Sequence, residues 1–129
     1  MKINKSISVV VLAMLFFSGC EALTPDNEYD VIYEVTGTST SVNIQYNDVS
    51  GYPIDLINVN LPWTLEMHVS VPYDRMASLM LFASNIGGIG TGSVIATLYV
   101  DGSISDTEID DNDDAMFDDG MVVVTDILF

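Results

Sequence analysis

The chain has 129 residues, of which three are Lys or Arg and 19 are Asp or Glu, so its formal net charge is −16. This length leaves room for one domain of the usual size once a targeting segment is removed. Because binding to a phosphate backbone needs clusters of Lys and Arg, the charge excludes a nucleic-acid-binding protein.

The first nineteen residues have the pattern of a secretory signal peptide. Lys2 and Lys5 give it a basic start, and an apolar run from Ile7 to Phe17 follows. This run is shorter than the roughly 20 apolar residues that a membrane-spanning helix needs, so we expect an export signal that is removed. Removal takes away both lysines and leaves Arg75 as the one permanently basic side chain, so the formal charge falls from −16 to −18.

Cys20 follows the signal and is the only cysteine in the chain. The segment Leu15–Cys20 resembles a bacterial lipobox, whose cysteine is diacylated and becomes the new N-terminus, although Phe17 stands where Leu is usual. A lone cysteine in an exported protein calls for such an explanation. We expect a lipoprotein anchored through diacylglyceryl-Cys20 and fatty acids such as palmitate; the alternative is an ordinary cleaved signal beside a coincidental cysteine. Two or three acyl chains hold a protein on a membrane where one does not.

The segment 20–29 predicts a lipidated tether, since it lacks periodicity and contains Pro25. We expect the folded domain at residues 30–129. Alternating apolar residues predict one strand over Val31–Val35 and a second over Val42–Tyr46. The turn-forming residues between them, Gly37–Ser41, predict that the two strands form a hairpin.

Further strands follow at short intervals. Ile54–Val59 is a weaker strand pattern, whereas Trp63–Val71 alternates over nine residues as a strand with one buried and one exposed face. Met76–Ser84 is long enough for a helix, but its glycine- and proline-containing flanks favour a core strand. Asp101-Gly102 is a strong turn signal joining Val94–Val100 to Ser103–Ile109. The last strand is expected over Met121–Leu128.

This series of seven or eight strands predicts an all-β protein, an immunoglobulin-like antiparallel β-sandwich without a cross-sheet disulfide. Gly37 and Gly102 fit turns, and Trp63 fits a bend into the core, so these three residues are expected to be structural. The expected core residues are Tyr33, Tyr46, Trp63, Leu79, Leu81 and Leu98.

A crowded acidic segment is the one place where the sequence suggests a ligand. Carboxylates without a countercharge repel one another unless solvent or a cation screens them, and Ca²⁺ prefers such oxygen ligands. The spacing of an EF-hand is absent, so a solvated acidic loop or a contact with a basic partner remain alternatives to a calcium site. The residues of this possible Ca²⁺ site are Asp106, Glu108, Asp110, Asp111, Asp113, Asp114, Asp118 and Asp119.

Catalytic chemistry has little support. His68 is the only histidine and lies on the expected exposed face of its strand. No nucleophile elbow accompanies it, and one histidine with one acylated cysteine cannot supply a zinc ligand set. The glycine-rich run Gly87–Gly92 has no adjacent lysine and opens no helix, so it fits a flexible loop better than a phosphate site. We therefore expect no enzyme and no cofactor other than possible Ca²⁺.

Five ordered phrases resemble the MmpS family of transport accessory proteins: Tyr33–Thr38, Val42–Tyr46, Val59–Trp63, Leu79–Ser84 and Leu98–Gly102. The resemblance runs over essentially the whole domain and implies a small β-sandwich at the cell envelope, with an accessory role beside export pumps in mycobacterial members. Those members have a transmembrane helix and often a C-terminal cysteine pair. With a lipobox and no further cysteine, this chain is similar to a lipoprotein-type relative.

These observations together predict a non-enzymatic, lipid-anchored envelope protein that acts as a transport-accessory or binding module. Its expected partners are the membrane, through Cys20, and an envelope or export-complex protein. The residue after the cysteine, Glu21, is not the aspartate of an inner-membrane retention signal, which favours the outer membrane. The alternative is a Ca²⁺-dependent surface or adhesion module that uses the acidic segment 106–119.

Overall fold

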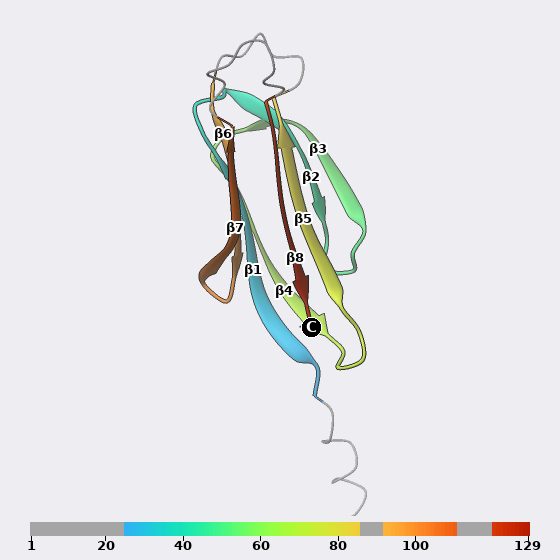
Figure 1. The fold of residues 1–129 in the computed structure, drawn as a ribbon. Coiled ribbons are helices and arrows are strands. Elements are labelled where there is room, and N and C mark those ends of the chain that lie inside the picture. The colour runs from blue at the N-terminus through green and yellow to red at the C-terminus, as the bar shows by residue number, and fades with distance from the viewer. Residues whose placement is uncertain (1–24, 86–91, 111–119) are drawn as a thin grey trace, which may run out of the picture.

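The computed structural model describes residues 25–85, 92–110 and 120–129, which form eight strands in two four-stranded antiparallel sheets (Figure 1). One sheet has the order β4-β1-β6-β7 and the other has the order β3-β2-β5-β8. The strands are β1 (Asn27–Thr36), β2 (Ser41–Asn47), β3 (Pro53–Asn60), β4 (Trp63–Val71), β5 (Ala77–Ser84), β6 (Val94–Val100), β7 (Ser103–Asp110) and β8 (Met121–Leu128).

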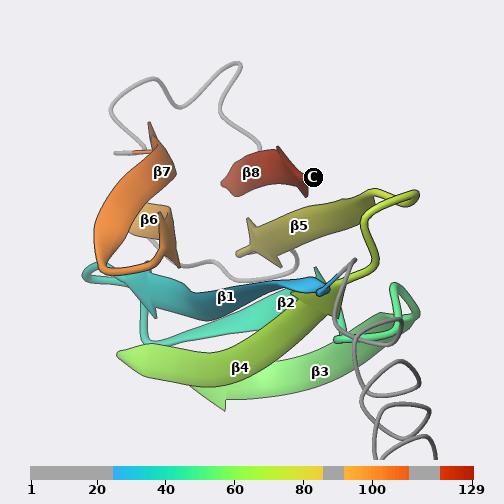
Figure 2. The same cartoon turned by 90° about the horizontal axis from the view of Figure 1, so that it is seen from below.

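The two sheets lie face to face, as the end-on view in Figure 2 shows, with β7 and β8 at one side and β3 and β4 at the other. This arrangement confirms the all-β, immunoglobulin-like sandwich predicted with seven or eight strands, and the described residues form eight. Within the three described ranges, no helix is long and apolar enough to cross a membrane.

The predicted hairpin between the first two strands is wrong. β1 pairs with β4 and β6, whereas β2 pairs with β3 and β5 in the other sheet. Gly37 has a φ of 134°, and the next two residues, Thr38 and Ser39, both donate their N–H to the Ser93 carbonyl. The connection therefore crosses from one sheet to the other, because these bonds tie it to the chain entering β6 rather than folding β2 back on β1.

The first strand begins earlier than its apolar alternation suggests. β1 starts at Asn27, so three residues assigned to the tether belong to the sheet. Asn27 pairs with Val71 and Tyr29 pairs with Val69, because β4 is long enough to supply partners for them. Pairing with a neighbouring strand extended β1 over residues whose own sequence carries no strand pattern.

The later strands are confirmed, including β5 as a strand rather than a helix. The turn between β6 and β7 has positive φ at both central residues, 50° at Asp101 and 80° at Gly102. That conformation is the one whose twist matches an antiparallel hairpin, and it favours Asp-Gly. Asp101 also exchanges two hydrogen bonds with the backbone of Asp30, at 2.8 and 2.9 Å, which ties the turn to β1.

The core fills the space between the sheets with alternate residues of β1, β2, β4, β5, β6 and β8. Tyr46 and Trp63 pack at its edge and are only partly buried, with ring centroids 5.7 Å apart. The buried apolar residues are Val31, Tyr33, Val35, Val42, Ile44, Val69, Val71, Leu79, Leu81, Ala83, Val94, Ala96, Leu98, Val122, Val124 and Leu128.

Candidate functional site

The start of β1 and the end of β8 lie at the same end of the sandwich, the lower end in Figure 1. Two side chains hold them together: Asn27 donates from Nδ2 and Tyr29 from its hydroxyl to the main-chain oxygen of Phe129, at 2.8 and 2.6 Å. Cys20 lies outside the described residues. Since β1 begins at Asn27, the chain that follows Cys20 enters the domain at this end, which we call the anchor end.

The carboxylates of Asp106 and Glu108 contact the neighbouring sheet rather than forming an open ligand set. Both lie on β7, at the edge of its sheet beside β8. Glu108 Oε2 accepts the N–H of Val123 at 2.7 Å, and Asp106 Oδ2 accepts the N–H of Thr125 at 3.0 Å. These carboxylates thus satisfy backbone donors on the outer side of β8, which would otherwise need water.

Of the other residues of the predicted calcium site, one lies within the described part of the chain and five lie outside it. Asp110 ends β7, and Asp111, Asp113, Asp114, Asp118 and Asp119 lie outside the described residues. In the part of the chain that the structure describes, no group of three or more His, Cys, Asp or Glu side chains is placed to hold a metal ion. The described acidic residues therefore give the Ca²⁺ alternative no geometric support.

His68 lies on the outer face of β4, as its alternation predicts, between two carboxylates of β1. Its Nδ1 is 3.0 Å from Asp30 Oδ1, and its Nε2 contacts Glu28 Oε2. The hydrogen bond to Asp30, and after it the bond to Glu28, raises the pKa of His68 above its usual 6.5. The bond to His68 in turn lowers the pKa of Glu28 below 4.5. Protonated His68 thus joins β1 and β4 as an exposed ion pair.

We expect an NMR titration of the His68 ring to give a pKa above 6.5, and the double change Glu28→Gln with Asp30→Asn to return it toward that value. Because the folded-state pKa is the higher one, the stabilisation is complete below pH 6.5 and is lost as the pH rises through the folded pKa. The control is Glu66→Gln on the same strand face. A His68 pKa at or below 6.5 would show that the two carboxylates do not hold the proton.

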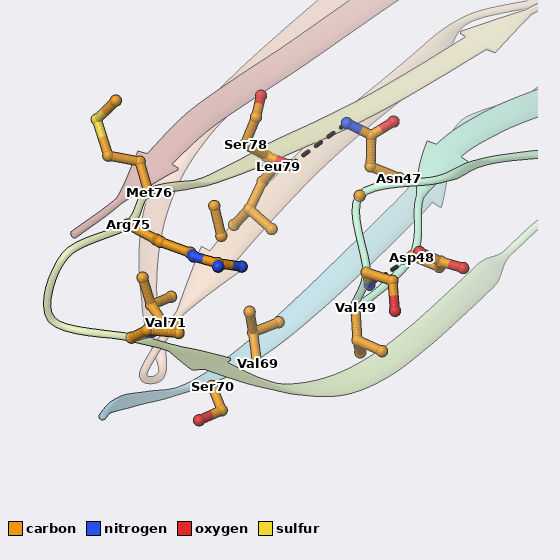
Figure 3. Close-up of a pocket in the computed structure, with 14 residues that line it drawn as sticks. Asn47, Asp48, Val49, Val69, Ser70, Val71, Arg75, Met76, Ser78 and Leu79 are labelled. Carbon is orange, nitrogen blue, oxygen red and sulfur yellow. Dashed lines mark hydrogen bonds between the residues drawn. The ribbon is translucent and has the colours of Figure 1, made fainter. Parts of the chain in front are cut away.

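A pocket of about 250 Å³ opens at the anchor end, between the two sheets (Figure 3). The β2–β3 turn (48–52), the end of β4, and the β4–β5 loop with the start of β5 form its walls. We call it the end pocket. Its lining residues are Asn47, Asp48, Val49, Ser50, Gly51, Val69, Ser70, Val71, Pro72, Arg75, Met76, Ala77, Ser78 and Leu79.

Arg75 is the cation of this pocket. Figure 3 shows its guanidinium extending into the space between Leu79 of one sheet and Val69 and Val71 of the other. The side chain is exposed, and no carboxylate in residues 25–85, 92–110 and 120–129 forms an ion pair with it. A permanently charged guanidinium beside apolar side chains, with no ion-pair partner among the described residues, can bind an anion.

Asp48 is the one carboxylate in the wall of the end pocket, and its own turn occupies it. Asp48 Oδ1 accepts the N–H of Ser50 and the N–H of Tyr52, both at 2.9 Å. A carboxylate held by two backbone donors shapes the turn, as Asp side chains commonly do. The pocket is therefore polar on the turn side, cationic at Arg75 and apolar where the two sheets face each other.

Sequence reasoning identified Arg75 only as the basic residue left after the signal is removed, not as part of a site. Its distinguishing signal is present in the sequence: it is a single basic side chain in a short loop between two apolar strands of a very acidic domain. The sequence does not show that the β2–β3 turn lies opposite Arg75, because the two segments are far apart along the chain. In the structure they are joined by a hydrogen bond from Asn47 Nδ2 to the Ser78 carbonyl, at 3.3 Å.

Comparison with known proteins gives one family. The family model described as Mycobacterium membrane protein matches residues 16–122, which include Cys20 and all strands up to the start of β8. No curated protein matches the chain.

Proposed function

Because the chain belongs to the Mycobacterium membrane protein family, whose strand motifs it shares, we propose that it is a lipid-anchored accessory protein of the cell envelope. It works by non-covalent contacts of its β-sandwich, without catalysis, beside an export complex or another envelope protein. The family match supports membrane association. The lipobox at Cys20 supports attachment by acyl chains, with the outer membrane favoured.

The observation that carries this proposal is the geometry of the anchor end. Six residues separate Cys20 from Asn27, where β1 begins. An extended chain spans at most about 3.3–3.6 Å per residue, so an acylated Cys20 holds the domain within roughly 25 Å of the lipid surface. The anchor end, with the end pocket, then faces the membrane, and the opposite end of the sandwich faces away from it.

Replacing Cys20 by Ser is expected to abolish palmitate incorporation and to release the protein from the membrane fraction. The physical reason is that the mature chain, with its single basic residue, has no electrostatic attraction to anionic lipid, so the acyl chains supply the attachment. Radiolabelled palmitate and detergent phase separation measure the two effects. The matched control is Ser18→Ala, a small-residue change within the signal that keeps the cysteine. Persistent membrane attachment of the Cys20→Ser protein would contradict the lipid anchor.

A further inference from the structure

We propose that the end pocket binds a single-chain amphiphile with an anionic head, the head on the Arg75 guanidinium and the chain against Val49 and Met76. This inference goes beyond the accessory role. It does not require the lipid anchor, since it rests on the pocket alone, and loss of palmitate labelling would leave it intact.

The choice of an anion follows from charge. The mature chain carries 19 acidic residues, so its surface field repels anions everywhere except close to a local cation. Arg75 is that cation, and within the described residues its guanidinium has no ion-pair partner. A guanidinium presents paired donors that match a carboxylate or phosphate, and such charge-assisted bonds are stronger than neutral ones.

The choice of an amphiphile follows from the side chains around Arg75. Val69, Val71 and Leu79 form a buried apolar floor, each about 1% exposed. Val49 and Met76 form opposite rims and are left 54% and 67% exposed. An alkyl chain lying between these rims would remove their apolar surface from water, which is favourable in proportion to the area covered. A small inorganic anion would contact Arg75 but leave both rims exposed.

The size of the end pocket selects a single chain. Its volume of about 250 Å³ lies just below the range of roughly 300–1,000 Å³ that drug-sized ligands occupy. Asp48 keeps its negative charge, but its Oδ1 is held in its own turn by the N–H groups of Ser50 and Tyr52, which offset part of its repulsion of an anionic head. Arg75 is the one lining residue of the pocket whose charge attracts a carboxylate or phosphate head.

The test uses the chain from Glu21 to Phe129, which contains all eight strands and the whole buried core. Decanoate is titrated and followed by calorimetry and by backbone NMR. We expect saturable binding with shifts at Val69, Val71 and Leu79, and at least tenfold weaker binding by decanol and by decyltrimethylammonium. The cationic probe is decisive, because the net charge favours it at any non-specific site.

Substitutions in the pocket distinguish the contribution of the anionic head to binding from that of the alkyl chain. Arg75→Gln is expected to lower the affinity for decanoate about tenfold or more, and Arg75→Lys to lower it less, since Lys keeps the charge without the planar fork. Met76→Ser is expected to weaken binding several-fold. The matched control is Tyr73→Ser, in the same loop but outside the pocket. This variant should bind decanoate with the same affinity as the unmodified protein. Thermal unfolding of each variant shows that the fold is kept.

Four results would overturn the proposal. Equal binding of decanoate by Arg75→Gln would remove the guanidinium from the site. Equal binding of decanol or decyltrimethylammonium would show apolar adsorption without anion recognition. Inorganic phosphate or acetate binding as tightly as decanoate would show an anion site without a place for a chain. Shifts confined to the outer faces of the sheets would place the ligand elsewhere.

Discussion

Replacing Gly37 by Ala is expected to destabilise the fold by about 3 kcal/mol or more, which few single substitutions exceed. A Cβ at this position would lie 2.1 Å from the Ser93 carbonyl oxygen and 2.8 Å from the carbonyl carbon. That oxygen accepts the N–H groups of Thr38 and Ser39, so it cannot move away without breaking both hydrogen bonds. The φ of 134° adds a backbone conformation that alanine rarely adopts.

Gly51 provides the control. Its φ is also positive, at 83°, but a Cβ there would meet nothing within 4 Å. Gly51→Ala should therefore show only the cost of the left-handed backbone, about 1–2 kcal/mol. Urea unfolding at neutral pH measures both variants, with unchanged slopes required for the comparison. Equal losses for the two variants would mean that Gly37 is needed for its backbone angle alone and that the contact with Ser93 relaxes.

Replacing Tyr33 by Ala is expected to destabilise the fold by about 3–5 kcal/mol, the usual cost of removing a large aromatic ring from a core. Tyr33 is fully buried at the centre of β1, and its ring centroid is 5.8 Å from that of Tyr46. Its hydroxyl donates to the Asn47 carbonyl at 3.2 Å. Tyr33→Phe keeps the ring and should cost only about 1 kcal/mol, the net contribution of one hydrogen bond. A large loss in the Phe variant would assign most of the effect to the hydroxyl instead.

Tyr33 also makes the free energy of unfolding depend on pH in the alkaline range. Burial raises the pKa of Tyr33 to about 12, against 10.0 for an ordinary tyrosine. Between these values the unfolded chain releases a proton that the folded chain retains, so the free energy of unfolding falls as the pH rises from about 10 to about 12. Denaturant titrations across this range should show a smaller fall for Tyr33→Phe. The same pH dependence in both proteins would assign it to other tyrosines.

The strands were predictable from local pattern, but their partners were not. Alternation alone identified β4 from Trp63 to Val71, because one face of that strand is buried and the other exposed. It could not show that β1 and β2 belong to different sheets, since a crossing connection and a hairpin use the same turn-forming residues. Gly37 looked like the centre of a turn, and only its contact with Ser93, 56 residues later, reveals why the chain crosses there.

The candidate site was predictable in its chemistry and not in its shape. Charge counting isolated Arg75, and the acidic residues of β7 were recognised as unusual. The sequence could not show that Asp106 and Glu108 meet backbone donors of β8, because that contact depends on two sheet edges lying side by side. For the same reason the end pocket leaves no continuous motif, because it is built from a turn within one sheet and a loop that crosses between the two sheets.

The carboxylates that contact β8 also affect how separate copies of the protein meet. β8 is the last strand of its sheet, and its exposed side chains include Met121, Val123 and Ile127. The unpaired backbone groups of such an edge strand can hydrogen-bond to a strand of another chain, which leads to aggregation. Here the outward N–H groups of Val123 and Thr125 are already bonded to acidic side chains, so an approaching strand finds its hydrogen-bonding positions taken and meets negative charge. The acidic side chains of β7 thus protect this edge of the sheet against strand addition by a second copy of the chain.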